Sequence, residues 1–268
     1  MKLDAEIKFA QSGAARLSLA MLVTLIALSG WSSCETPGDQ NSDTMEEVSA
    51  NPWRHVEGYV VERISEFDQI GSERKAELDA IADYVQERHD HGLLARLMFV
   101  CTHNARRSQM AQVWSATAIH HYGLDSVMVF SGGSEKTAVN ERAIGALRRA
   151  GMEVRPERLS ENPRYSIKYA EGAEAMTVWS KLLDDAKNPR RSFSALMTCT
   201  EASHDCPVVE GAEQRFGLAY VDPKISDGTP EEFETYDARC AQISREMLYA
   251  MSQVANGARS VVPTNQEN

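Results

Sequence analysis

Apolar and polar segments alternate along the chain in a way that predicts strands and helices in turn. The predicted strands are short apolar runs, at Ala95–Val100, Ser126–Ser131 and Ser194–Cys199, with further candidates at Tyr165–Ala170, Ala175–Val178 and Leu218–Val221. The predicted helices have apolar residues at helical spacing, over Ser108–His121, Asn140–Ala150 and Pro230–Val254. This alternation favours an α/β fold, with a mainly parallel central sheet flanked by helices.

Two more helical patterns precede the first strand, between Pro52 and Arg88. We expect Ser72 to cap the second helix, which would place Leu78, Ile81 and Val85 on one face. The simplest interpretation is a helical hairpin over residues 52–92, packed on the main domain at 93–256, with a polar tail over 257–268.

The first 34 residues have the pattern of a targeting segment. A basic region precedes the continuous apolar run Leu17–Gly30, which has the length of a signal peptide. Small residues then precede Cys34, as in a bacterial lipoprotein cleavage box, so we expect export, lipidation of Cys34 and a membrane anchor facing the periplasm. Residues 35–51 are acidic and polar, which predicts a flexible tether. The alternatives are an uncleaved anchor, or a cytoplasmic protein whose start codon is misassigned.

The charge balance limits the class of partner. The chain has 28 Lys and Arg residues against 39 Asp and Glu residues, a net charge of −11, which argues against nucleic acid as the main partner. An acidic protein that binds an anionic substrate must concentrate positive charge locally. The adjacent pair Arg106 and Arg107 is the candidate place.

The segment Leu97–Gln112 combines a strand, a polar loop and a helix start. Loop N–H groups and the helix dipole together make an anion cradle. Cys101 begins this loop and Arg107 ends it, in the spacing C-x5-R. The dipole and the guanidinium favour the thiolate, and Arg107 can bind two oxygens of a tetrahedral oxyanion. Ser108 can donate a hydrogen bond to the sulfur. The alternative is a buried structural cysteine beside surface arginines.

The loop sequence CTHNARRSQMA resembles the phosphate loop of the low-molecular-weight protein tyrosine phosphatases, and of the arsenate reductases built on that fold. The resemblance covers roughly Ala95–Val254. It implies that Cys101 is the nucleophile, Arg107 the oxyanion clamp and Ser108 the thiolate partner, and that Asn104 orders the loop. The loop residues that it implies for substrate binding are Thr102, His103, Asn104, Ala105 and Arg106.

Three positions depart from the family pattern. His103 stands where glycine is common, and a positive φ there would be costlier for histidine. Arg106 stands where cysteine or an aliphatic residue is common. Gln112 stands where arsenate reductases often have a glutamate associated with a bound potassium ion, so we do not carry over that ion. No nucleotide, flavin or metal motif stands out, so we expect no bound cofactor or metal. Cys240 falls on the last predicted helix and is expected in the core.

Asp222 and Pro223 form an Asp-Pro pair late in the chain. Hydrolysis of a cysteinyl-phosphate needs an acid for the leaving oxygen and then a base for water. The family has an aspartate of such a pair in both roles, so the resemblance implies Asp222 as general acid. Asp-Pro pairs by themselves are usually turns.

Cys199 and Cys206 lie in the spacing C-x6-C-P. This resembles the thioredoxin-coupled arsenate reductases, and it implies a relay. Cys101 would attack arsenate, Cys199 would form a disulfide with Cys101, and Cys206 would transfer that disulfide to a segment open to a thioredoxin-like donor. A static disulfide, common in exported proteins, and inert thiols are the alternatives. An exported enzyme would need a donor other than cytosolic thioredoxin.

We therefore predict a thiol-dependent oxyanion enzyme that resembles arsenate reductase, with an external thiol donor such as thioredoxin. The alternative is a low-molecular-weight phosphatase that hydrolyses phosphotyrosine or small phosphomonoesters. A third possibility is an anion-binding protein without turnover. The first two differ in their dependence on Cys199 and Cys206.

Overall fold

The structure, a computed structural model, describes residues 51, 53–158, 160–199 and 209–260, with side chains up to residue 257. These residues lie in one compact unit, 48–268. The predictions for residues 1–50, including the signal segment, Cys34 and most of the tether, lie outside the described residues, as does Cys206.

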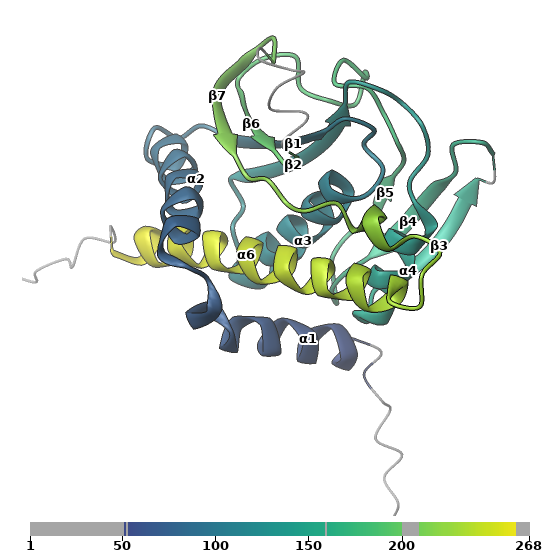
Figure 1. Cartoon of the computed structure of the whole chain (residues 1–268). Coiled ribbons are helices and arrows are strands. Elements are labelled where there is room, and N and C mark those ends of the chain that lie inside the picture. Colours follow the sequence, from purple (N-terminus) through teal and green to yellow (C-terminus); the bar gives the residue numbers. More distant parts are fainter. Residues whose placement is uncertain (1–50, 52, 159, 200–208, 261–268) are drawn as a thin grey trace, which may run out of the picture. The chain divides into compact units, whose positions relative to one another are not determined.

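A four-stranded parallel sheet forms the centre of this unit (Figure 1). Its order is β2 (Val127–Gly133), β1 (Ala95–Cys101), β6 (Phe193–Met197) and β7 (Ala212–Gly217). β1 pairs with both β2 and β6, so it lies inside the sheet and is almost fully buried. The predicted parallel sheet flanked by helices is confirmed.

Helices cover one face of the sheet. They are α3 (Arg107–Tyr122), α4 (Glu141–Arg149) and the long α6 (Glu232–Ser260), together with α1 (Arg54–Ser65), η1 (Phe67–Gln69) and α2 (Ser72–Asp90). In Figure 1, α6 runs alongside α3 with α1 and α2 next to it, and all three contact α6. Leu97 and Phe99 of β1 point into the core that these helices share.

The two predicted N-terminal helices are confirmed, and they belong to the same core as α6. The ring of Tyr59 on α1 stacks on the buried ring of Trp114 on α3, with centroids 5.2 Å apart. Trp114 Nε1 in turn donates to Cys240 Sγ at 3.1 Å. Cys240 is buried, as expected, and burial raises the pKa of its thiol to about 11.

Two details of the helices differ from the sequence-based expectation. Ser72 does not cap α2: it is the first helical residue, and Gly71 occupies the cap position. The apolar residues at helical spacing in the predicted helix Pro230–Val254 are expected to face the core, but one of them, Phe233, is 62% exposed, and the Arg149 guanidinium lies 5.1 Å from its ring centroid. The sequence pattern predicted both details. The backbone conformation where each helix begins determines which residue is the cap and which side chains of the first turn face solvent.

A second, antiparallel sheet is formed by β3 (Glu153–Arg158), β4 (Arg164–Lys168) and β5 (Met176–Val178). The last two match predicted strand candidates. β3 is not among the predicted strands, because its residues are largely polar and partly or fully exposed, and show no strand-like run of apolar side chains.

The last strand of the parallel sheet is not the predicted Leu218–Val221. It is β7, a mostly exposed and polar edge strand. Leu218 and Tyr220, which follow, are buried because the chain continues past the end of β6, where Leu218 N donates to Met197 O and Tyr220 N donates to Thr198 O. The apolar pattern therefore marks the connection that leads to Asp222.

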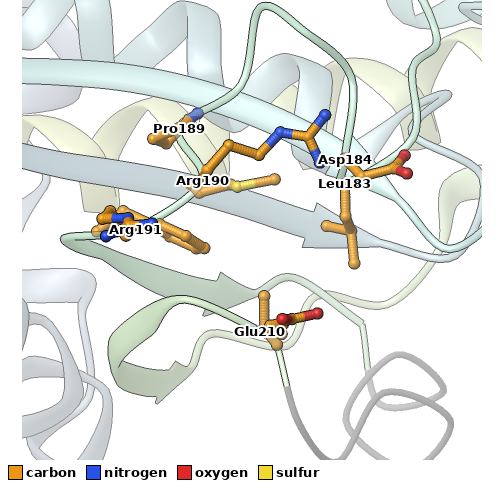
Figure 2. Close-up of a pocket in the computed structure, with 9 residues that line it drawn as sticks. Leu183, Asp184, Pro189, Arg190, Arg191 and Glu210 are labelled. Carbon is orange, nitrogen blue, oxygen red and sulfur yellow. The ribbon is translucent and has the colours of Figure 1, made fainter.

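The other face of the sheet has a smaller apolar cluster, which includes Met98, Val100, Phe193 and Cys199. A cavity of about 450 Å³ opens beside it, between the loop that precedes β6 and the residues that precede β7. Figure 2 shows Arg190 and Arg191 on one side of this cavity and Glu210 on another. Its lining includes none of the predicted site residues.

Within the described part of the chain, no helix has both the length and the apolar character needed to cross a membrane.

Candidate active site

Cys101 is the last residue of β1, opposite Gly133 of β2, at the carboxyl end of the parallel sheet. The loop that follows leads directly into α3, which begins at Arg107. Cys101 Sγ lies 3.0 Å from Ser108 Oγ, and both side chains are buried. The predicted nucleophile and its predicted thiolate partner are therefore adjacent, beside the N-terminus of a helix.

Asn104 organises the inside of the loop. Its φ is +47°, the left-handed conformation that asparagine tolerates better than most residues. Asn104 Nδ2 donates to Ser108 Oγ at 2.9 Å, and its Oδ1 accepts from Lys181 N and Gln109 Nε2. Since Ser108 Oγ accepts the hydrogen bond from Asn104, its own proton is available for the Cys101 sulfur.

The conformational cost considered for His103 does not arise. The positive φ falls on the next residue, Asn104, and not on His103. The imidazole is about half exposed, and its Nε2 lies 3.2 Å from Glu135 Oε2. A side chain at 103 therefore fits because it points away from the loop centre.

The loop carbonyls are bound by groups that approach from outside. Thr102 O accepts from Glu135 N, His103 O from Ser180 Oγ, Asn104 O from Gln109 Nε2, and Ala105 O from Asn140 N. Carbonyls fixed outward leave the N–H groups to face a bound anion. The backbone also packs closely: a Cβ on Gly133 would lie 2.5 Å from Thr102 O.

Both loop arginines contact Asp222. Arg107 Nη2 donates to Asp222 Oδ2 at 2.8 Å, and Arg106 Nε donates to Oδ1 at 3.0 Å. Arg107 Nη1 also donates to Tyr220 O, which fixes its guanidinium at the loop. Residues more than 110 positions apart thus meet in one site, and the residue predicted as general acid contacts the residue predicted as oxyanion clamp.

Asp222 is held in its charged form. Partial burial by itself would raise the pKa of this carboxyl. The Lys224 N–H, which donates at the start of η2 (Pro223–Ser226), and the charges of Arg107 and Arg106 outweigh burial and lower the pKa below its ordinary value. Asp222 is therefore a carboxylate at neutral pH when no oxyanion is bound.

Cys199 lies two residues after β6, beside the same loop. It is fully buried, and its Sγ lies 3.8 Å from Thr102 Oγ1. The structure thus brings one member of the predicted cysteine pair to the residue next to the nucleophile. Its predicted partner, Cys206, lies outside the described residues.

Sequence reasoning missed Lys181 and Gln109. Lys181 is buried, its backbone N–H donates to Asn104, and its Nζ donates to Ser131 Oγ at 3.1 Å. Burial lowers the pKa of the Lys181 ammonium to about 8. Gln109 Nε2 joins the loop to Trp179 O. The sequence offered one hint, a lone lysine beside apolar residues in WSKLL.

Comparisons with known proteins find a matching family model and similar sequences. Residues 96–167 match the model of the family described as low molecular weight phosphotyrosine protein phosphatase. An arsenate reductase from Bacillus licheniformis is 28% identical over 139 residues, which are 51% of this chain and 79% of the relative. An arsenate reductase from Halalkalibacterium halodurans is 28% identical over 136 residues, which are 51% of this chain and 79% of the relative.

The chain also aligns with solved structures. The arginine phosphatase YwlE from Geobacillus stearothermophilus aligns with 63% of this chain and 97% of its own, at 18% identity and a TM-score of 0.42. Residues 96–167, which match the family model, include the loop and Cys101.

Proposed function

We propose that this chain is a thiol-dependent oxyanion enzyme that reduces arsenate. Its similarity to the low molecular weight phosphotyrosine protein phosphatase family model and to arsenate reductases supports this proposal. The observation that carries this proposal is the contact of Cys101 Sγ with Ser108 Oγ at 3.0 Å, beside the Arg107 guanidinium at the start of α3. This arrangement suits a thiolate that attacks a tetrahedral oxyanion.

The reaction begins when the Cys101 thiolate attacks arsenic and displaces one oxygen as water, after protonation. Cys199 thiolate then attacks Cys101 Sγ. The sulfur–arsenic bond breaks, its electron pair stays on arsenic, and arsenite leaves as the two thiols become a disulfide. The position of Cys199 beside Thr102 supports this step. Cys206 thiolate then attacks Cys199, which releases Cys101 and forms a Cys199–Cys206 disulfide that an external dithiol reduces.

A phosphatase activity is the second candidate function, and Asp222 favours it. Its carboxylate contacts the same two arginines that would bind the oxyanion. In such a reaction Cys101 attacks phosphorus, the ester oxygen leaves with a proton from Asp222, and water then hydrolyses the cysteinyl-phosphate. Both reactions use Cys101, Arg107 and Ser108.

One experiment separates the two functions. The full-length chain in mild detergent, its Cys101→Ser variant and its Cys199→Ser, Cys206→Ser double variant are assayed for arsenate reduction with a thioredoxin system and for p-nitrophenyl phosphate hydrolysis. We expect arsenate turnover that either change abolishes. Phosphatase turnover that survives the double change, without arsenate reduction, would establish the second function instead. Inactivity of the wild type on both substrates would favour anion binding without turnover.

We further propose that the protein is exported and anchored through a lipid on Cys34. The apolar run Leu17–Gly30 and the small residues before Cys34 support this proposal. Metabolic labelling with a radioactive fatty acid in a bacterial host should mark the wild type and not Cys34→Ala. Labelling of neither protein, or of both equally, would contradict it. An enzyme at that location would draw electrons from an extracytoplasmic thiol donor.

A further inference from the structure

The helix α2 of the N-terminal hairpin contacts the connection that leads to Asp222. Arg74, in the first turn of α2, binds with all three guanidinium nitrogens. Its Nε donates to Glu246 Oε2 of α6 at 2.8 Å, and its Nη2 donates to Ala219 O at 3.2 Å. Its Nη1 donates to Glu77 of the same helix at 2.6 Å. One guanidinium therefore joins α2, α6 and the chain that precedes the active-site aspartate.

Tyr220 is held by Arg74 and by two backbone contacts. Its ring is buried, and the ring centroid lies 4.7 Å from the guanidinium carbon of Arg74. The Tyr220 N–H donates to Thr198 O at 3.1 Å, and the Tyr220 carbonyl accepts from Arg107 Nη1 at 2.9 Å. Both backbone contacts lead into the candidate site, because Thr198 precedes Cys199 and Arg107 is the predicted oxyanion clamp.

The Tyr220 carbonyl constrains the orientation of Arg107. A guanidinium binds two oxygens of one oxyanion only when its N–H groups have the right direction. Arg107 Nη2 donates to Asp222 Oδ2, and a bound oxyanion competes with that carboxylate for the same donor. The contact with the Tyr220 carbonyl uses the other nitrogen, Nη1. The backbone at Tyr220 can therefore keep Arg107 oriented while the oxyanion binds.

We propose that Arg74 is a positioning residue, which holds the backbone at Ala219 and Tyr220 so that Arg107 is oriented for an oxyanion before one arrives. Arg74 lies outside residues 96–167, so the family match does not supply this role. The helical hairpin is then a working part of the site and not only a part of the core. The expected effect on turnover rests on the proposed function, whereas the expected effect on oxyanion affinity does not.

The test compares Arg74→Met with the wild type, both as the full-length chain in mild detergent. Titration calorimetry measures the Kd for inorganic phosphate, which we expect to rise about 10-fold, because a charge-assisted hydrogen bond loses its alignment. We expect kcat for arsenate reduction to fall about 10- to 100-fold, since misplacement by a distant substitution is costly. Amide hydrogen exchange over residues 218–222 should become faster.

Arg245→Met is the matched control. Arg245 Nη1 lies 3.1 Å from Glu66 Oε2, so this pair also joins α6 to the hairpin, and both side chains are 18% exposed. In the Arg74 pair the exposed fractions are 18% and 4%. Loss of Arg245 should lower the temperature of thermal unfolding, as loss of Arg74 does. It should leave the phosphate Kd, kcat and the exchange of residues 218–222 unchanged.

Two further variants separate positioning from folding. Removal of Arg74 alone leaves the buried Glu246 carboxylate without this cation, which is strongly destabilising. Arg74→Met combined with Glu246→Gln removes both charges, so it should recover thermal stability but not phosphate affinity. Arg74→Lys keeps the charge but lacks the planar fork that reaches Glu246 and Ala219 together. It should therefore also recover stability without full phosphate affinity.

The outcomes distinguish the two levels of proposal. Arsenate reduction in the wild type, with wild-type phosphate affinity in every Arg74 variant, would overturn the inference and leave the proposed function intact. An equal loss of phosphate affinity in Arg245→Met would show general destabilisation, and would also overturn the inference. Weaker phosphate binding confined to the Arg74 variants, with no arsenate reduction by the wild type, would support the inference and contradict the proposed function. A wild type that neither binds phosphate nor reduces arsenate would overturn both.

Discussion

At the scale of single residues, Ser108 couples the loop to the sulfur of Cys101, the proposed nucleophile. Its hydroxyl accepts from Asn104 and is left to donate to Cys101. A hydrogen bond to a charged group contributes about 1.5–3 kcal/mol, roughly twice that of a neutral one. In the proposed reaction this hydroxyl stabilises the sulfur of Cys101 as nucleophile and as leaving group.

Replacement of Ser108 by alanine removes this donor. We expect Cys101 to react with iodoacetamide at pH 7 roughly 10-fold more slowly, since about 1.4 kcal/mol corresponds to a factor of ten. Mass spectrometry of the alkylated peptide measures the rate. Ser65→Ala, at an exposed position on α1, is the control and should react like the wild type. Equal rates of Cys101 alkylation in the wild type and both variants would exclude the proposed role of Ser108 as a hydrogen-bond donor to the sulfur.

Lys181 gives a prediction about pH and stability. Its pKa is about 8 in the folded protein and 10.5 ordinarily, because burial disfavours the ammonium. Between about pH 8 and pH 10.5, Lys181 is protonated in the unfolded chain and neutral in the folded protein. The free energy of unfolding therefore rises with pH over this range. Relative to Lys181→Met, we expect the wild type to gain about 2 kcal/mol between pH 7.5 and 10.

Urea unfolding of both proteins across this pH range measures that difference, in which titrations common to the two proteins cancel. The exposed Lys187→Met is the matched control and should run parallel to the wild type. A constant difference between wild type and Lys181→Met would show that Lys181 keeps its charge in the folded protein.

At the scale of elements, the loop is built against the end of β2. Gly133 pairs with Cys101, and a methyl group there would lie 2.5 Å from Thr102 O and 2.9 Å from Asn104 N. Both neighbours are backbone atoms of the loop, so the loop itself must move to make room. Small shifts in a catalytic loop cost far more activity than stability, because the reacting atoms lose their alignment.

Gly133→Ala should therefore lower kcat for arsenate reduction by about 100-fold. Circular dichroism and thermal unfolding check that the fold persists. Gly58→Ala is the matched control: no atom lies within 4 Å of its new methyl group, and alanine in a helix stabilises by roughly 0.5–1 kcal/mol relative to glycine. Full activity in Gly133→Ala would show that the loop tolerates displacement.

At the scale of the whole described unit, the N-terminal helices are part of the core of the enzyme. Tyr59 of α1 stacks on Trp114 of α3, and Trp114 contacts Cys240 of α6. One apolar cluster includes residues from all three helices and from β1. The hairpin and the sheet are therefore expected to unfold together.

Tyr59→Ala tests this coupling. Loss of a large, partly buried ring should lower the free energy of unfolding by about 2–3 kcal/mol and keep a single transition. The exposed Val61→Ala on the same helix should change it by less than about 0.5 kcal/mol. Calorimetry distinguishes one transition from two. A separate low-temperature transition in Tyr59→Ala would make the hairpin an independent module.

The sequence determined by itself the elements that have a strong local pattern. β1, α3 and α6 have continuous apolar runs or helical spacing, and the loop between β1 and α3 has its chemistry in adjacent positions. β3 and β7 could not be found in this way. Both strands are largely polar, so their strand conformation comes from hydrogen bonds to neighbouring strands and not from a local apolar run.

The residues of the candidate site also fall into two groups, those that the local sequence pattern places together and those that only the folded structure brings together. Cys101, Arg107 and Ser108 are close in sequence, and the loop motif was enough to place them together. Only the tertiary structure decided that Arg106 shares Asp222 with Arg107, that Lys181 is buried behind Asn104, and that the positive φ lies at 104 and not at 103. These are contacts across 77 to 116 positions, or a backbone angle set by them. Local patterns cannot encode such contacts, because the sheet that brings the segments together forms only when the whole domain folds.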